Sequence, residues 1–271
     1  MLQHHVQSAL ILEDDADWDV FLRQQLVDLA RAMRALQNNT AATSSPYGTE
    51  WNIMALGHTG INNRLNIDQQ YWIARDDPTV IAESKRTWSR KPDLSAPALS
   101  GGRDRVVMQV SKLTGTAAYA ISLRGAARML YDQVLLPNAA AIDTAISDMC
   151  RRDEYDTPFC YGTYPMLIGR YRAIGPKARD SDRRTSSNEA KPGSGGGQSH
   201  EERLEPESEF TVFPVSLNAR TLLQGGVMVR AVNVEKDMVG EADLRTFRLP
   251  RGRAVWVAKD EYVGVESAKL P

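Results

Sequence analysis

A short apolar run followed at once by three carboxylates constrains this chain more than any other feature. Residues 8–12 read Ser-Ala-Leu-Ile-Leu, and Glu13, Asp14 and Asp15 come next. A continuous apolar run of this length is typical of a strand buried on both faces of a sheet. Side chains that follow such a strand emerge at the edge of the core, where ligands bind in open α/β sheets. The sequence therefore predicts an α/β fold with a polar site at the end of this strand.

The three adjacent carboxylates point to metal chemistry. They repel one another, and a hard divalent cation relieves that repulsion. The same cation can bridge the phosphates of a nucleoside diphosphate, on which negative charge grows when a sugar departs. The alternative is that these residues only favour the start of the helix that follows. Asp17 fits that capping role best, whereas Glu13, Asp14 and Asp15 are predicted to bind a metal ion.

Composition indicates a folded chain and argues against two classes of protein. The 271 residues are 42% apolar and 25% charged, within the globular range, and their net charge of −1 lacks the basic field of a nucleic-acid binder. The sequence has no apolar run of about 18 residues, so it predicts no membrane span. The N-terminus has neither the basic start nor the apolar core of a signal peptide, and the location of the protein stays unknown. Cys150 and Cys160 allow one disulfide, which leaves the redox compartment open.

Strand-like and helix-like segments alternate along much of the chain. Apolar residues at helical spacing predict an amphipathic helix over residues 18–36, and residues 51–58 are expected to form a second buried strand. Residues 59–105 carry three prolines and predict a long excursion with little regular structure. Further strands are expected over residues 106–113, 117–122 and 159–168, and further helices over residues 123–134 and 140–152.

Composition also divides the chain into three parts. The α/β domain is expected to span residues 1–176. Residues 177–208 are rich in Gly, Ser, Arg and Glu, and they cannot bury enough apolar surface to offset their ordering entropy. They are therefore predicted to be a disordered linker. Residues 209–271 recover some apolar pattern and are expected to form a small C-terminal tail that makes a few strands or packs on the main domain.

Four segments, in order, resemble glycosyltransferase family 25, which includes lipopolysaccharide glycosyltransferases and collagen galactosyltransferases. The fungal branch looks closest. The segments are residues 10–18 with the acidic signature, 51–58 with a Leu-Gly-His ending, 115–130 and 141–148. The resemblance covers roughly residues 8–182, and four motifs in the same order are more specific than any one alone.

The resemblance implies a fold, a donor and a metal. The fold would be a nucleotide-diphospho-sugar transferase (GT-A-like) sandwich with a mixed central sheet. Mn²⁺ or Mg²⁺ would be held by the Glu13-Asp14-Asp15 group. A UDP-sugar would be the donor, and a glycan, glycoprotein or glycolipid would be the acceptor.

The resemblance also implies roles for residues outside the acidic triplet. Asp143, with Asp148 on the same helix, becomes the candidate catalytic group, because the attacking hydroxyl must lose its proton to a base. On spacing alone neither aspartate stands out, and Asp143 is also favourable at a helix start. Ser122 and Arg124 are candidates for the donor site. His58 joins them, although a lone histidine at a strand end is more often structural.

The chain departs from the family pattern in two places. Family members carry a nucleotide-binding strand and a second block before the acidic motif, which here begins at residue 13, so we expect an N-terminally incomplete domain whose full-length form enters the secretory pathway. Fungal relatives have histidines where this chain reads Ile168-Gly169-Arg170-Tyr171. A non-catalytic relative is therefore the alternative. A metal-dependent phosphotransferase or hydrolase is a third, but no phosphate-cradling glycine loop supports it.

Overall fold

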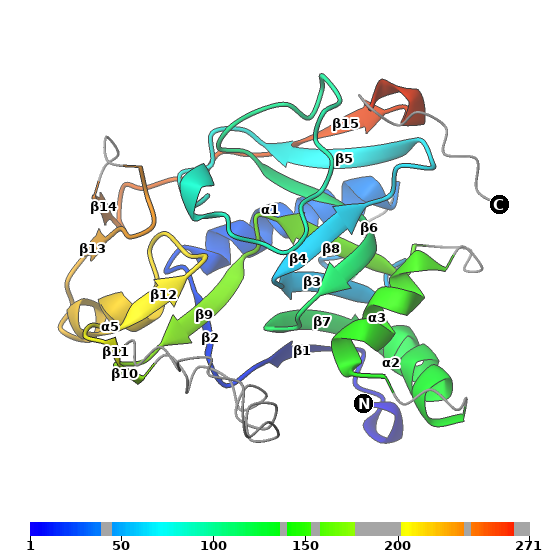
Figure 1. The fold of residues 1–271 in the computed structure, drawn as a ribbon, viewed down its shortest axis with the longest axis horizontal. Helices are drawn as coiled ribbons and strands as arrows, with labels where there is room; N and C mark the ends of the chain where they lie inside the picture. Colours follow the sequence, from blue (N-terminus) through cyan, green and yellow to red (C-terminus); the bar gives the residue numbers. More distant parts are fainter. Residues whose placement is uncertain (39–44, 136–139, 153–157, 177–201, 236–239, 263–271) are drawn as a thin grey trace, which may run out of the picture.

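The computed structural model describes residues 1–38, 45–135, 140–152, 158–176, 202–235 and 240–262, which form a mixed α/β fold around one large sheet (Figure 1). Eight strands of the described residues make this sheet. Strands β3 and β8 run parallel and the other neighbours run antiparallel, so the sheet is mixed. In spatial order the strands are β1 (Ser8–Leu12), β7 (Ala118–Ser122), β3 (Ile53–Gly57), β8 (Cys160–Tyr164), β6 (Arg105–Thr114), β5 (Gln69–Ala74) and β15 (Arg253–Val257), and β4 (Gly60–Asn63) pairs with β6.

Helices cover both faces of this sheet. They are α1 (Leu22–Leu36), α2 (Leu123–Leu130) with a π-helical turn η3 (Tyr131–Leu135), and α3 (Ile142–Arg151). Successive residues of β3 point to opposite faces. Ile53 packs in the core cluster that contains Ile146 of α3, whereas Met54 packs with Leu29 and Met33 of α1. The helices α1 and α3 therefore lie on opposite sides of the sheet.

A smaller sheet stands beside the large one. It consists of β2 (Ala16–Trp18), β9 (Ile168–Arg172) and β12 (Glu207–Glu209), with β9 in the middle. The chain enters it directly from β1, through the acidic turn. The remaining short elements are η1 (Leu2–His4), η2 (Glu83–Lys85), β10 (Gly175–Pro176), β11 (Glu202–Arg203), α5 (Val215–Leu223), β13 (Met228–Arg230), β14 (Glu241–Asp243) and η5 (Lys259–Glu261).

The prediction that residues 8–12 form a strand is confirmed, but the prediction that this strand is buried on both faces is wrong. Strand β1 lies at one end of the sheet and pairs with β7 on one side. The side chains of Leu10, Ile11 and Leu12 are 40–48% exposed. An end strand has one neighbour, and in the described residues no helix covers these side chains, so an apolar run of strand length is no proof of a central position.

The other element predictions hold in part. The strand and helix expectations for residues 51–58, 106–113, 117–122 and 18–36 correspond to β3, β6, β7 and α1. The expectation of little regular structure over residues 59–105 holds only in part: β4 and β5 lie there, whereas residues 75–104 contain only the short turn η2 (Glu83–Lys85). The single strand expected over residues 159–168 is two, β8 and β9, and they belong to different sheets.

The C-terminal part contributes to the large sheet. Strand β15 pairs with β5 along five residues, from Arg253 opposite Ile73 to Val257 opposite Gln69. Of the range expected to be a linker, residues 177–201 lie outside the described residues. Residues 202–208 contain β11 and most of β12, which pair with β10 and β9.

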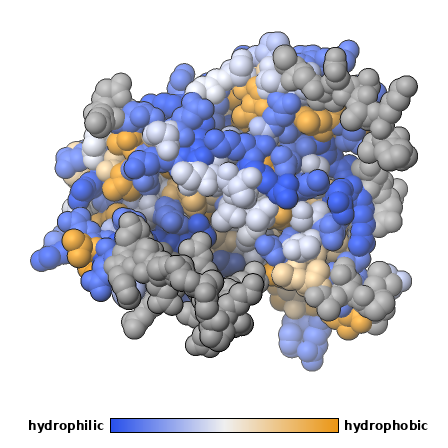
Figure 2. Space-filling model, viewed as in Figure 1, coloured by the Kyte–Doolittle hydropathy of each residue, from blue (hydrophilic) through white to orange (hydrophobic). Residues whose placement is uncertain are grey.

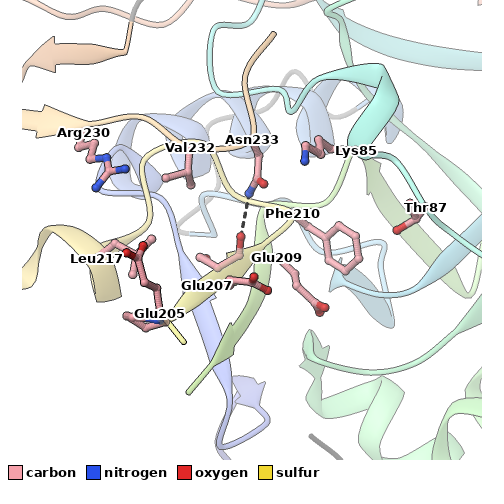
Figure 3. Close-up of a pocket in the computed structure, with 12 residues that line it drawn as sticks. Lys85, Thr87, Glu205, Glu207, Glu209, Phe210, Leu217, Arg230, Val232 and Asn233 are labelled. Atoms are coloured by element: carbon pink, nitrogen blue, oxygen red, sulfur yellow. Dashed lines mark hydrogen bonds between the residues drawn. The ribbon is translucent and has the colours of Figure 1, made fainter. Parts of the chain in front are cut away.

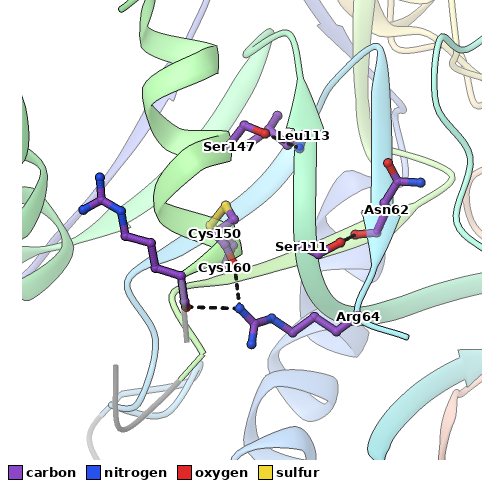
Figure 4. The surroundings of a disulfide bond; sticks show 8 residues. Asn62, Arg64, Ser111, Leu113, Ser147, Cys150 and Cys160 are labelled. Atoms are coloured by element: carbon purple, nitrogen blue, oxygen red, sulfur yellow. Dashed lines mark hydrogen bonds between the residues drawn. A yellow bond between two sulfur atoms is a disulfide. The ribbon is translucent and has the colours of Figure 1, made fainter. Parts of the chain in front are cut away.

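The two cysteines form a disulfide between α3 and β8 (Figure 4). Both Cys150 and Cys160 are fully buried. The guanidinium of Arg64 donates to the carbonyl oxygens of Cys150 and Arg152, which ties the end of α3 to the strand side of the core. Hydrophilic residues cover most of the molecular face in Figure 2, with apolar residues in scattered patches. Among the described helices, none combines the length and the apolar character needed to cross a membrane.

Candidate functional site

The acidic turn and the start of α3 line one cavity of about 750 Å³. Glu13, Asp14 and Asp15 reach it from the turn between β1 and β2. Asp143 reaches it from the first turn of α3, and the connection between β6 and β7 forms the wall between them. The cavity therefore brings together four acidic residues that the sequence singled out from two distant segments.

Two arginines of β9 complete this cavity. Arg170 and Arg172 are two residues apart on the strand, so their side chains share one face of the small sheet. Arg172 is buried and its Nη1 lies 2.7 Å from Oδ2 of Asp15. Its Nη2 lies 3.2 Å from Oε2 of Glu209 on β12, and Arg170 lies 2.9 Å from the same oxygen. The acidic turn is thus connected to β12 through paired cations.

Asp15 is the most constrained member of the triplet. Its backbone oxygen accepts a hydrogen bond from Tyr171 N over 2.7 Å, which fixes the turn against β9. Arg172 holds Oδ2, while Oδ1 is buried and has no hydrogen-bond partner among the described residues. A buried carboxylate oxygen without a donor is costly, so this atom is where a cation or a proton donor would bring the largest gain.

Glu13 and Asp14 are held more loosely. Glu13 N donates to Ala117 O, and Oε1 of Glu13 accepts a 3.2 Å hydrogen bond from the Thr116 hydroxyl. Asp14 is exposed and makes no hydrogen bond or ion pair with any described residue. Its charge is therefore free to act on a ligand.

Asp143 and Asp148 lie on the same helix but in different surroundings. Asp143 lines the cavity, where Oδ1 accepts from Thr144 N and Oδ2 accepts from Gly115 N. Asp148 does not line it; its carboxylate forms an exposed 2.9 Å ion pair with Arg151. The structure therefore separates the two aspartates that the resemblance had grouped.

Ser122 and Arg124 have structural contacts away from the cavity. Ser122 is the N-cap of α2: its hydroxyl accepts from Gly125 N and donates to Trp51 O. Arg124 forms a 3.0 Å ion pair with Glu50, and the hydrogen bond from Arg124 lowers the pKa of that carboxyl. Neither side chain lines the cavity where the acidic triplet lies.

His58 is also placed in the core rather than in the cavity. Its Nε2 lies 2.9 Å from Thr163 O, and because a carbonyl only accepts, Nε2 carries the proton. Nδ1 is buried, and no described residue hydrogen-bonds to it. Burial lowers the pKa of this imidazole to about 4, so His58 is neutral under ordinary conditions.

Asp17 has a different capping role from the one expected. It is buried, and its carboxylate accepts hydrogen bonds from Ser208 Oγ and from both the backbone N and Oγ of Ser216. Ser216 lies in the first turn of α5, so Asp17 caps α5 rather than α1. Near α1 it is Asp19 that accepts from Phe21 N.

Sequence reasoning missed Arg170, Arg172 and Glu209 as parts of the site. A signal was present, because two arginines in alternation at the end of an apolar strand place two cations on one face. What the sequence does not show is that β9 pairs with both β2 and β12, and this pairing brings these residues to the acidic turn.

The ligand atoms that these residues offer are of the kind that a hard divalent cation binds. Glu13, Asp14 and Asp15 supply carboxylate oxygens, which Mg²⁺ and Mn²⁺ prefer, and Oδ1 of Asp15 lacks a partner. Among the described residues, no three His, Cys, Asp or Glu side chains are gathered closely enough to hold an ion by themselves. Sites of this kind commonly take one or two carboxylates and complete the coordination with substrate phosphates and water.

Comparisons of this chain with protein-family models, with curated proteins and with solved structures found no match. The resemblance to glycosyltransferase family 25 therefore rests on the four sequence segments and stays a prediction.

Proposed function

We propose that this chain is a glycosyltransferase that moves a sugar from a nucleoside-diphosphate donor, with a UDP-sugar expected, to a hydroxyl group of a glycan, glycoprotein or glycolipid. One observation carries the proposal: Glu13, Asp14, Asp15 and Asp143 line the same cavity as Arg170 and Arg172. We also propose that the mixed α/β fold is of the nucleotide-diphospho-sugar transferase (GT-A-like) type. The mixed sheet with helices on both faces supports that reading.

The carboxylates and the arginines of the cavity could both serve the diphosphate of the donor. A divalent cation, Mn²⁺ or Mg²⁺, would supply positive charge for the departing diphosphate, and one or two carboxylates of the Glu13-Asp14-Asp15 group would hold it together with the phosphates and water. Arginine guanidinium groups are good phosphate partners, and Arg170 has a buried Nε that no described residue accepts a hydrogen bond from. Arg172 holds Asp15 in place and keeps the acidic turn against β9.

Asp143 is the residue placed to act on the acceptor. Its carboxylate lines the cavity from α3, and its contacts among the described residues are two backbone N–H groups rather than a cation. A carboxylate whose contacts in the described residues include no cation can take the proton of an attacking hydroxyl. Ser122, Arg124 and His58 take part in folding under this proposal, since none of them lines the cavity.

The test is calorimetric titration of UDP and several UDP-sugars into the chain, with Mn²⁺ and with chelator. The most informative variant is Asp14→Asn, because Asp14 has no partner among the described residues whose loss would disturb the fold. Asp148→Asn is the matched control, since it removes the same charge outside the cavity. We expect saturable, metal-dependent binding that weakens about tenfold or more in Asp14→Asn and not in Asp148→Asn.

Asp143→Asn separates binding from chemistry. It should leave the donor affinity unchanged and lower the rate of sugar transfer by about a hundredfold or more, the usual contribution of a general base. A folded chain that binds no nucleotide under any of these conditions would sink the transferase proposal.

A non-catalytic relative is the second candidate, and the pairing of Asp15 with Arg172 favours it. That ion pair already neutralises one member of the triplet without a metal. Indifference to both metal and UDP would favour this candidate.

A further inference from the structure

A second cavity, of about 590 Å³, is lined by residues in and around β12 and β13 and by Lys85 and Thr87 (Figure 3). Along the upper side of the view stand Arg230, Asn233 and Lys85, and along the lower side stand the glutamates of residues 205–209. Glu209 belongs to this cavity and is ion-paired with Arg170 and Arg172, which line the first one. The two cavities therefore share one set of charged contacts.

Two residues in the wall of this second cavity have a left-handed backbone conformation. Phe210 has φ of 72°, which is strained for a bulky side chain, and Asn233 has φ of 57°, which asparagine tolerates. The amide of Asn233 donates to Ser208 O and Thr211 O, on either side of Phe210, and so holds that turn in place. Strained residues that their surroundings hold in this way gather at ligand sites.

The charges around this cavity are only partly paired. Glu209 is matched by two arginines, and Glu207 is matched by the buried Arg203. Glu205, Lys85 and Arg230 form no ion pair with any described residue. Among the described residues, the unpaired groups are thus the cations Lys85 and Arg230 on one side and the carboxylate of Glu205 on the other. Because the unpaired positive charges outnumber the unpaired negative one, we expect a ligand that carries negative charge.

The carboxylates narrow the chemistry of that ligand. Glu205, Glu207 and Glu209 all line the cavity, and the hydroxyl of Ser208 between them donates to Asp17. Three glutamates repel a polyanion or an acidic peptide, but they accept hydrogen bonds from hydroxyl groups. A saccharide with a single acidic group satisfies both sides: its hydroxyls face the glutamates and its anion faces Lys85 and Arg230.

We propose that this second cavity binds a saccharide unit that bears an acidic group, a part of the acceptor separate from the hydroxyl that reacts beside Asp143 in the first cavity. The assignment of the bound sugar as acceptor rests on the proposed transferase function, because the shared Glu209 contacts place it beside the candidate donor cavity. The binding itself does not depend on that function and is measured without nucleotide.

The experiment titrates cellobiouronic acid and its neutral counterpart cellobiose into the full chain. The cavity variant is Lys85→Gln with Arg230→Gln; both side chains are exposed and form no ion pair in the part of the chain that the structure describes, so the fold is expected to persist. The matched control is Lys259→Gln with Arg251→Gln, which removes the same charges from residues that do not line the cavity. We expect the acid to bind at least about tenfold more tightly than cellobiose, and the cavity variant alone to lose that preference.

Three results would overturn the proposal: no binding of either disaccharide, equal losses in the two double variants, or preferential binding of a glutamate-rich peptide. A UDP titration of the same preparation keeps the two proposals apart. Saccharide binding without nucleotide binding would remove the transferase function and leave the saccharide site, and the opposite pattern would do the reverse.

Discussion

The buried imidazole of His58 should make the stability of this fold depend on pH in a way that can be calculated. The ring is 1% exposed, its Nε2 donates to Thr163 O, and its Nδ1 has no partner. Protonation would place a second N–H in the core without an acceptor. For this reason burial lowers the pKa from 6.5 to about 4.

The direction of the effect follows from proton uptake. Between the two pKa values the unfolded chain binds a proton at His58 that the folded chain does not. The contribution of neutral His58 is therefore fully present above pH 6.5 and is lost as the pH falls towards 4. With these pKa values, lowering the pH from about 7.5 to about 5 costs about 2 kcal/mol of folding free energy.

The assay is denaturant unfolding of the wild type and of His58→Gln at both pH values. Glutamine keeps an N–H donor for Thr163 O and does not titrate. Other titrating groups contribute equally to both chains, so the wild type should lose about 2 kcal/mol more than the variant over this interval. Identical pH dependence in the two chains would refute the reasoning and indicate that the ring accepts its proton in the folded state.

Three further predictions concern stability and are checked by the same unfolding measurements. Ile53→Ala in the centre of the sheet should cost about 3 kcal/mol, whereas Ile11→Ala on the exposed end strand should cost about 1 kcal/mol or less; equal costs would contradict the strand order. Replacing Cys150 and Cys160 together by Ser should cost about 3 kcal/mol, because the disulfide closes a loop with a sequence separation of 10, and an unchanged midpoint would argue against the bridge. Gly125→Ala should destabilise by about 1–3 kcal/mol although alanine favours helices, because its Cβ would meet the backbone carbonyl just before β3; a more stable variant would show that α2 packs less closely.

The local sequence pattern was sufficient to predict an element that is regular and packed against many neighbouring elements. The amphipathic spacing over residues 18–36 predicted α1, and the apolar run over residues 51–58 predicted β3 in the sheet interior. Each is recognisable because the residues that face the core recur with the period of the element. The same reasoning marked the acidic triplet and Asp143 as residues that lie at the ends of elements.

The local sequence pattern failed where the burial of an element depends on which strands or helices it packs against. Residues 8–12 have the composition of a buried strand, yet β1 has one strand neighbour and is exposed. Strand β5 was missed because it lies among prolines and polar residues. It is buried because it pairs with β6 and β15, and its own sequence does not indicate that burial. His58, Ser122 and Arg124 matched a family segment by position, but their contacts are with the core and with neighbouring turns.

The sequence by itself determined that Glu13, Asp14 and Asp15 follow a strand and that Asp143 begins a helix, because these are local properties of spacing and composition. Only the tertiary structure decided that the two segments meet in one cavity, that Asp148 points elsewhere, and that β9 adds Arg170 and Arg172. The physical reason is that pairing between strands joins residues far apart in the chain. Asp15 and Arg172, 157 positions apart, touch because β9 pairs with β2, and no local pattern encodes that register.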